Sequence, residues 1–242
     1  MSKADTLIPA DPTRAGKSLK DQNRWQLWLI LAANTLFLYG IFQSNAIRVD
    51  GLRALFTDAR NLLPVGFALT VTTVINGFLS VPMKNRLVFL RWYSALPGHR
   101  AFSRYARLDP RIELSDLPRL CGGAVPVEAT DQNRVWYRIY KSVENDPAVR
   151  QVHRDFLLLR DYTGICALFI VCYGIIGLYA IPSLRIGLLY VLILLAQFIV
   201  VQQAASNYGI EFVTTVLARK GGWTETAVAR KRKPKKTPDQ LG

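Results

Sequence analysis

Residues 164–200 read GICALFIVCYGIIGLYAIPSLRIGLLYVLILLAQFIV, and Arg185 is the only charged residue among them. A Pro-Ser pair near the middle divides the stretch into two runs. A helix formed by either run is apolar on almost every face, so it must be enclosed by protein or surrounded by lipid. The stretch therefore indicates either the core of a large domain or a transmembrane helical hairpin.

Further uncharged windows elsewhere in the chain decide between these alternatives. Four windows have at least 23 residues each. At about 1.5 Å per residue, a helix of that length reaches roughly 34 Å, which is enough to cross a hydrocarbon core of about 30 Å. Four such helices in 242 residues leave too little amphipathic sequence to enclose them in a soluble core. The predicted transmembrane windows are Trp25–Ile47, Asn61–Met83, Tyr162–Leu184 and Ile186–Ile210.

The order of the windows gives the predicted fold class, an all-α integral membrane protein. Its four transmembrane helices form two hairpins, and a small helical cytoplasmic insert lies between the second and third spans. The expected segments are an N-terminal tail at 1–24, a first hairpin at 25–83, a basic insert at 84–161, a second hairpin at 162–210, and a helix end with a polybasic tail at 211–242.

Basic residues are distributed unequally between the two sides that this arrangement creates. The segments 1–24, 84–161 and 211–242 contain 27 of the 31 lysines and arginines. Loops that are rich in these residues stay in the cytoplasm, according to the positive-inside rule. We therefore expect both termini and the insert to be cytoplasmic, with the protein in the plasma membrane, the inner membrane of a bacterium.

Arginines recur with helical spacing in the insert. Turns at Pro97–Gly98 and Asp109–Pro110 predict a short helix over residues 99–108. A basic stripe on it can bind anionic headgroups, at about 1 kcal/mol per residue near the surface. The alternative is a phosphate-bearing ligand, because guanidinium groups suit phosphates. The candidate residues are Arg100, Arg104, Arg107 and Arg111.

The carboxyl end is polybasic and follows a predicted break at Gly221-Gly222. We expect this tail to be disordered, because so many positive charges cannot build a core. Beside the inner leaflet it would bind anionic lipid rather than nucleic acid. Its basic residues are Arg230, Lys231, Arg232, Lys233, Lys235 and Lys236.

Two further helices are predicted in the insert. Residues 131–145 form an amphipathic helix in which Trp136 and Tyr140 alternate with basic residues, and we favour packing in a small helical domain over nucleic-acid binding. The next helix begins with Asp146 as its cap and Pro147 in its first turn. Nothing breaks that helix before the third window, so it is predicted to enter the membrane without interruption. We expect Asp155, Arg160 and Asp161 on a solvated or intersubunit face of it.

The predicted spans contain amides and hydroxyls but no charged residue at depth. The candidate intramembrane polar residues are Asn34, Thr72, Asn76 and Gln197. On antiparallel helices the two asparagines have similar depth and could hydrogen-bond to each other. Such residues usually join helices, helped by close approach at glycines, although in an oligomer they can also line a pore. The glycines are Gly174, Gly177 and Gly187.

Local motifs give no support for catalysis. The chain has no P-loop and no G-x-S-x-G turn, and its three cysteines and two histidines lack the spacing of a zinc site. We therefore expect a protein that is not an enzyme and that uses no metal and no cofactor.

The layout of the chain resembles small multi-span effector proteins of bacterial defence systems, an architectural likeness without a shared motif. It implies a homo-oligomer that couples a cytoplasmic protein partner or anionic ligand to the membrane bundle, as a pore-forming or membrane-perturbing effector. The alternative is a scaffold that anchors a cytoplasmic complex to the membrane. A third class is an enzyme that acts on lipid.

Overall fold

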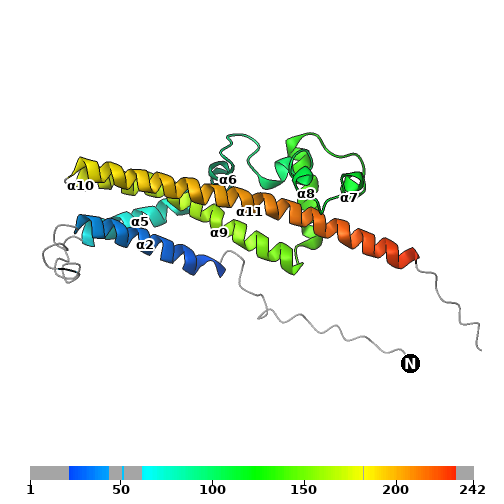
Figure 1. Ribbon diagram of the computed structural model, residues 1–242, viewed down its shortest axis with the longest axis horizontal. Helices are drawn as coiled ribbons and strands as arrows, with labels where there is room; N and C mark the ends of the chain where they lie inside the picture. Colours follow the sequence, from blue (N-terminus) through cyan, green and yellow to red (C-terminus); the bar gives the residue numbers. More distant parts are fainter. Residues whose placement is uncertain (1–21, 44–50, 52–61, 182, 233–242) are drawn as a thin grey trace, which may run out of the picture.

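The computed structural model describes residues 22–43, 51, 62–181 and 183–232, and all regular structure in this part of the chain is helical (Figure 1). The α-helices are α2 (Arg24–Phe42), α5 (Leu62–Phe78), α6 (Val81–Phe89), α7 (Leu117–Cys121), α8 (Ala129–Val143), α9 (Pro147–Leu168), α10 (Gly174–Ala180) and α11 (Leu184–Arg232). Short 3₁₀ helices are η4 (Pro97–Arg100), η5 (Tyr105–Leu108) and η6 (Leu114–Asp116), and η7 (Phe169–Tyr173) is a π-helix. The predicted all-α fold is confirmed for the described residues.

Three helices are long and apolar enough to cross a membrane. They are α2, the continuous helix from Pro147 to Ala180, and the first 39 residues of α11. These helices support an integral membrane protein. The second predicted window forms α5, which has 17 residues and so reaches only about 26 Å. Its chain then bends at Leu79-Ser80, and the side chain of Ser80 caps the separate helix α6.

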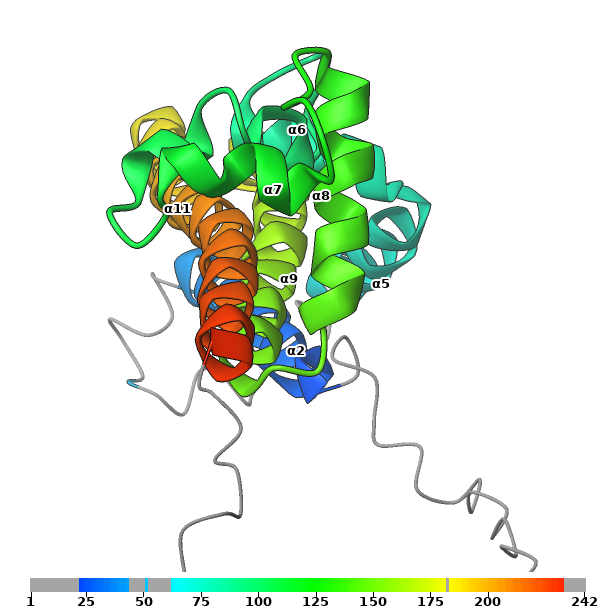
Figure 2. The same ribbon diagram turned by 90° about the vertical axis from the view of Figure 1, so that its right-hand side faces the viewer.

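The two longest helices lie side by side and organise the molecule (Figure 1). In both views the insert helices α7 and α8 lie on one side of the α9–α11 pair and α2 lies on the other (Figure 2). The predicted start of α9 is confirmed, because Oδ1 of Asp146 accepts hydrogen bonds from the backbone N–H groups of Ala148 and Val149. The helix continues through η7 into α10, as the sequence predicted.

A tight connection joins α10 to α11. The first ends at Ala180 and the second begins at Leu184, so the chain reverses at the predicted turn, of which Pro182 lies outside the described residues. A Cβ atom on Gly177 would lie 2.7 Å from the ring of Tyr190, and one on Gly187 would lie 3.4 Å from the carbonyl oxygen of Gly177. The predicted close approach of helices is therefore found between α10 and α11, at Gly174, Gly177 and Gly187.

Two separate hydrophobic cores are arranged along the α9–α11 pair. One contains Leu38, Ile165 and Tyr190 and joins α2, α9 and α11 within the apolar windows. The other contains Trp136, Phe156 and Phe212 and joins the insert to the charged half of α9 and the later part of α11. Both long helices therefore belong to both cores.

The helix predicted over residues 99–108 is wrong. The chain forms η4 and η5 instead, with turns between them. The reason is a buried amide on α8, because Oε1 of Gln132 accepts hydrogen bonds from the backbone N–H groups of Phe102 and Ser103. In an α-helix those groups would donate to carbonyl oxygens four residues earlier.

The break predicted at Gly221-Gly222 is also wrong, because α11 continues through both glycines to Arg232. A glycine in a helix interior is about 1 kcal/mol less favourable than alanine. The packing of the preceding buried turns of α11 can offset this cost. Arg230, Lys231 and Arg232 thus lie at the end of a helix rather than in a disordered tail. The remaining basic residues of the predicted tail, Lys233, Lys235 and Lys236, lie outside the described residues.

Candidate functional site

An aromatic cluster fastens the insert to both long helices. Trp136 of α8 lies edge-on to Phe212 of α11, with ring centroids 5.2 Å apart, and its Nε1 donates to the carbonyl oxygen of Val213. The ring of His153 on α9 stacks on Phe212, with the two ring centroids 4.5 Å apart. Tyr140 completes the cluster, with its hydroxyl 3.2 Å from Nδ1 of His153. Because Trp136 is only 4% exposed, it packs a helical core and is not a platform for stacking bases.

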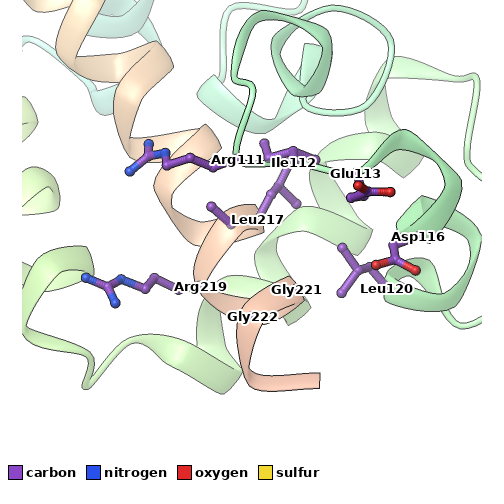
Figure 3. A pocket seen from close by; sticks show the side chains of 10 residues that line it. Arg111, Ile112, Glu113, Asp116, Leu120, Leu217, Arg219, Gly221 and Gly222 are labelled. Carbon is purple, nitrogen blue, oxygen red and sulfur yellow. The ribbon is translucent and has the colours of Figure 1, made fainter. Parts of the chain in front are cut away.

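A cavity of about 350 Å³ lies between the 111–120 segment of the insert and residues 217–222 of α11. Leu120 and Leu217 line it, together with residues of both charge signs (Figure 3). In Figure 3, Arg111 and Arg219 extend toward one side, whereas Glu113 and Asp116 lie on the other. This mixed-charge cavity is the candidate binding site on the insert.

The two arginines of the cavity already have acidic neighbours. Arg111 makes a two-pronged ion pair with Asp109, with Nη2–Oδ2 at 2.6 Å and Nε–Oδ1 at 2.9 Å. Hydrogen bonding from Arg111 lowers the pKa of Asp109 to about 2 against the opposing effect of burial, so this carboxylate is ionised at neutral pH. Nε of Arg219 lies 3.6 Å from Oδ1 of Asp146. A lone phosphate would have to compete with these carboxylates, whereas a polar protein surface could complement both signs.

The predicted arginine stripe is not formed, because its helix is absent. Arg100 ends η4, Arg104 precedes η5, Arg107 lies within η5, and Arg111 follows it in a turn. Arg104 and Arg107 are exposed, and among the four only Arg111 lines the mixed-charge cavity. Binding of headgroups or phosphate by these residues stays a prediction.

The predicted intramembrane polar residues have different surroundings. Gln197 of α11 donates from Nε2 to the hydroxyl of Tyr162 on α9 at 2.8 Å, which is the helix-joining contact expected of such an amide. Asn34 donates to the carbonyl oxygen of Ile30 in its own helix, and Oδ1 of Asn76 is buried without a hydrogen-bond partner. The predicted bond between the two asparagines is therefore wrong. Thr72 is completely buried.

Sequence reasoning missed a buried ion cluster at the junction of the bundle and the insert. Arg160 and Asp161 were expected on a solvated or intersubunit face, but they are 7% and 3% exposed. Lys84 of α6, also buried, reaches Asp161. A signal existed, because Lys84 directly follows the second apolar window and Asp161 directly precedes the third, so antiparallel spans bring them to the same depth. Burial itself could not be read from the sequence, since α6, which carries Lys84, packs against α9 only in the folded bundle.

Comparison of the chain with family models, curated proteins and solved structures finds no match. Among the residues that the structure describes, no group of three or more histidine, cysteine, aspartate or glutamate side chains could hold a metal ion.

Proposed function

We propose that this is a four-span plasma-membrane protein that couples a cytoplasmic protein partner, bound at the insert, to its transmembrane bundle. The observation that supports the proposal most directly is the continuity of α9 and α11 between the two hydrophobic cores. A helix moves nearly as a rigid rod over such lengths, so a displacement of the insert would tilt or rotate the same helices inside the membrane. The mixed-charge cavity supports a protein as the partner, because groups of both signs line it.

In the proposed topology, α5 is the fourth transmembrane helix. Phe67, Val74 and Phe78 of α5 are 68%, 54% and 82% exposed, and this apolar surface suits contact with lipid. The helix packs against α2 and α9, so it belongs to the bundle rather than to the insert. A bilayer can thin locally around a span of about 26 Å at a modest cost.

Single-cysteine variants test this topology. With the natural cysteines replaced by alanine, Ala10→Cys and Ser115→Cys should react with a membrane-impermeant maleimide only from the cytoplasmic side of oriented membranes. Ser183→Cys, in the α10–α11 turn, should react only from the opposite side. Labelling of Ala10→Cys and Ser115→Cys from opposite sides would contradict the four-span topology, because α2 and α5 could not then both cross the bilayer.

Two features of the bundle bear on how a signal could act inside the membrane. The π-helix η7 interrupts the α-helical hydrogen bonding of the lever formed by α9 and α10, and such turns are frequent at functional sites. At this point the hydroxyl of Tyr173 lies 2.7 Å from Oγ1 of Thr35 on α2. The interior of one bundle is filled by Leu38, Phe169 and Tyr190. Any pore of the proposed effector must therefore form between subunits of a homo-oligomer.

Ion flux from liposomes tests the coupling. The full chain would be reconstituted in vesicles of phosphatidylethanolamine and phosphatidylglycerol, and potassium efflux would be recorded. Trp136→Ala removes the contact between the insert and Phe212 of α11, and so imitates a displacement of the insert by a partner. This variant should change the potassium efflux about 5-fold or more, which is the lower end of typical coupling between two sites. Tyr137→Ala, at a neighbouring position that is 50% exposed, is the matched control and should leave efflux unchanged.

Equal efflux for the wild type and both variants would contradict the pore-forming effector and favour the scaffold. A specific observation supports that second candidate, since Leu108, Leu114 and Val127 of the insert are 60%, 50% and 89% exposed. Such apolar side chains on the insert suit a stable protein contact. The scaffold must be tested with the full chain, because the core of the insert includes Phe212 and Leu217 of α11.

A further inference from the structure

A second cavity, of about 410 Å³, lies where α2, α5, α6 and α9 meet. Three cationic side chains line it, Arg24, Lys84 and Arg160, together with the carboxylate of Asp161. Farther along the helices, toward the middle of the predicted spans, its wall becomes apolar and includes Leu31 and Ile165. This junction cavity thus has a charged end at the membrane boundary and an apolar end inside the bundle.

The charged end is built from buried side chains. Oδ1 of Asp161 lies 3.0 Å from Nη2 of Arg160 and 3.4 Å from Nζ of Lys84. The side chains of Lys84, Arg160 and Asp161 are 8%, 9% and 4% exposed. Two of these three groups are cationic, and the exposed Arg24 also lines the cavity. Closely spaced cationic groups at one end of a cavity suit an anion, because charge-assisted hydrogen bonds to a phosphate are stronger than those between neutral groups.

A neighbouring amide offers a contact of another kind. Asn76 of α5 lines the junction cavity, and its Oδ1 is buried without a hydrogen-bond partner. Buried polar atoms are normally satisfied, so an unpaired one beside a cavity points to a missing donor. A hydroxyl group on the ligand could supply that hydrogen bond.

We propose that the junction cavity binds one anionic phospholipid of the cytoplasmic leaflet, with a hydroxyl-bearing headgroup such as glycerol. The phosphate accepts charge-assisted hydrogen bonds from Lys84 and Arg160, a headgroup hydroxyl donates to Asn76, and an acyl chain follows the apolar wall past Leu31. A free phosphate ion would leave that wall without a partner, which is why the occupant is a lipid. The site depends on the membrane location in the proposed function and is independent of coupling or ion flux.

Lipid binding to the purified full chain in detergent tests this site, with native mass spectrometry as the readout. Dioleoyl phosphatidylglycerol should bind about tenfold or more tightly than dioleoyl phosphatidylcholine, as expected for contacts to a charged group. Inorganic phosphate should compete only weakly. Equal affinity for the two lipids would overturn the proposal, and so would phosphate that displaces the lipid at concentrations similar to that of phosphatidylglycerol itself.

Two substitutions with opposite charge effects separate the site from a general effect on folding. Lys84→Gln keeps the Arg160–Asp161 pair but removes one positive charge from the cavity, so it should weaken phosphatidylglycerol binding about tenfold. Asp161→Asn adds a net positive charge and should strengthen it. The exposed Arg138→Gln removes the same charge from the insert surface, away from the junction cavity and from the candidate arginines, and should change nothing. Shifts of both cluster variants in the same direction would overturn the electrostatic site, whatever the flux measurements show.

Discussion

Replacing Asp161 with alanine is expected to lower the free energy of unfolding by about 3–5 kcal/mol, because it leaves buried cations without their carboxylate. Arg160 and Lys84 both approach the same oxygen of Asp161, and all three side chains are less than one-tenth exposed. Unfolding in lipid-free detergent, followed by tryptophan fluorescence, would measure the loss without interference from bound anionic lipid.

The matched control for this prediction is Asp155→Ala on the same helix. Asp155 also pairs with an arginine, Arg154, but the two side chains are 29% and 37% exposed. Exposed pairs typically contribute about 0–1 kcal/mol, so this variant should change the free energy of unfolding little. Losses of equal size in the two variants would contradict a special role for the buried cluster.

A combined replacement gives the reverse test. Buried ion clusters that are exchanged for apolar side chains of similar volume often cost nothing. The triple variant Lys84→Met, Arg160→Met, Asp161→Leu should therefore recover most of the stability that Asp161→Ala loses. Such a recovery would show that unpaired charge, rather than lost packing volume, causes the defect.

The second large effect is expected where α10 packs against α11, because Gly177→Leu should lower the free energy of unfolding by about 3 kcal/mol, the upper end of typical overpacking costs. A Cβ atom there would lie 2.7 Å from Cδ1 and 3.0 Å from Cε1 of Tyr190. That ring is only 1% exposed, so it cannot swing into lipid to make room. The two helices would have to separate instead.

Gly66→Leu on α5 is the control for Gly177→Leu. Gly66 is exposed, and a Cβ atom on it would meet nothing within 4 Å. Leucine also favours helix more than glycine does, by up to about 1 kcal/mol, so this variant should be neutral or slightly stabilising. Thermal unfolding of both variants in the same detergent compares them. A neutral Gly177→Leu would mean that the two helices do not approach closely in the membrane.

The sequence by itself determined the features that depend on local composition. Long uncharged windows predict helices suited to lipid, and the structure confirms this for α2, for α9 with α10, and for α11. The cap at Asp146 and the turn before Leu184 were also readable, because cap and turn residues act on their immediate neighbours. The second window, Asn61–Met83, forms the helix α5, which has 17 residues and is shorter than the window.

The tertiary structure alone decided the features that depend on distant partners. Gln132 lies 30 residues from Phe102, yet its side chain takes the N–H group that a helix at 99–108 would have required. Lys84 and Asp161, separated by a whole insert, form a buried pair only because α6 folds against α9. The preference of a helix for lipid is a sum over its own residues, whereas a buried hydrogen bond or ion pair needs a partner that only the folded chain supplies.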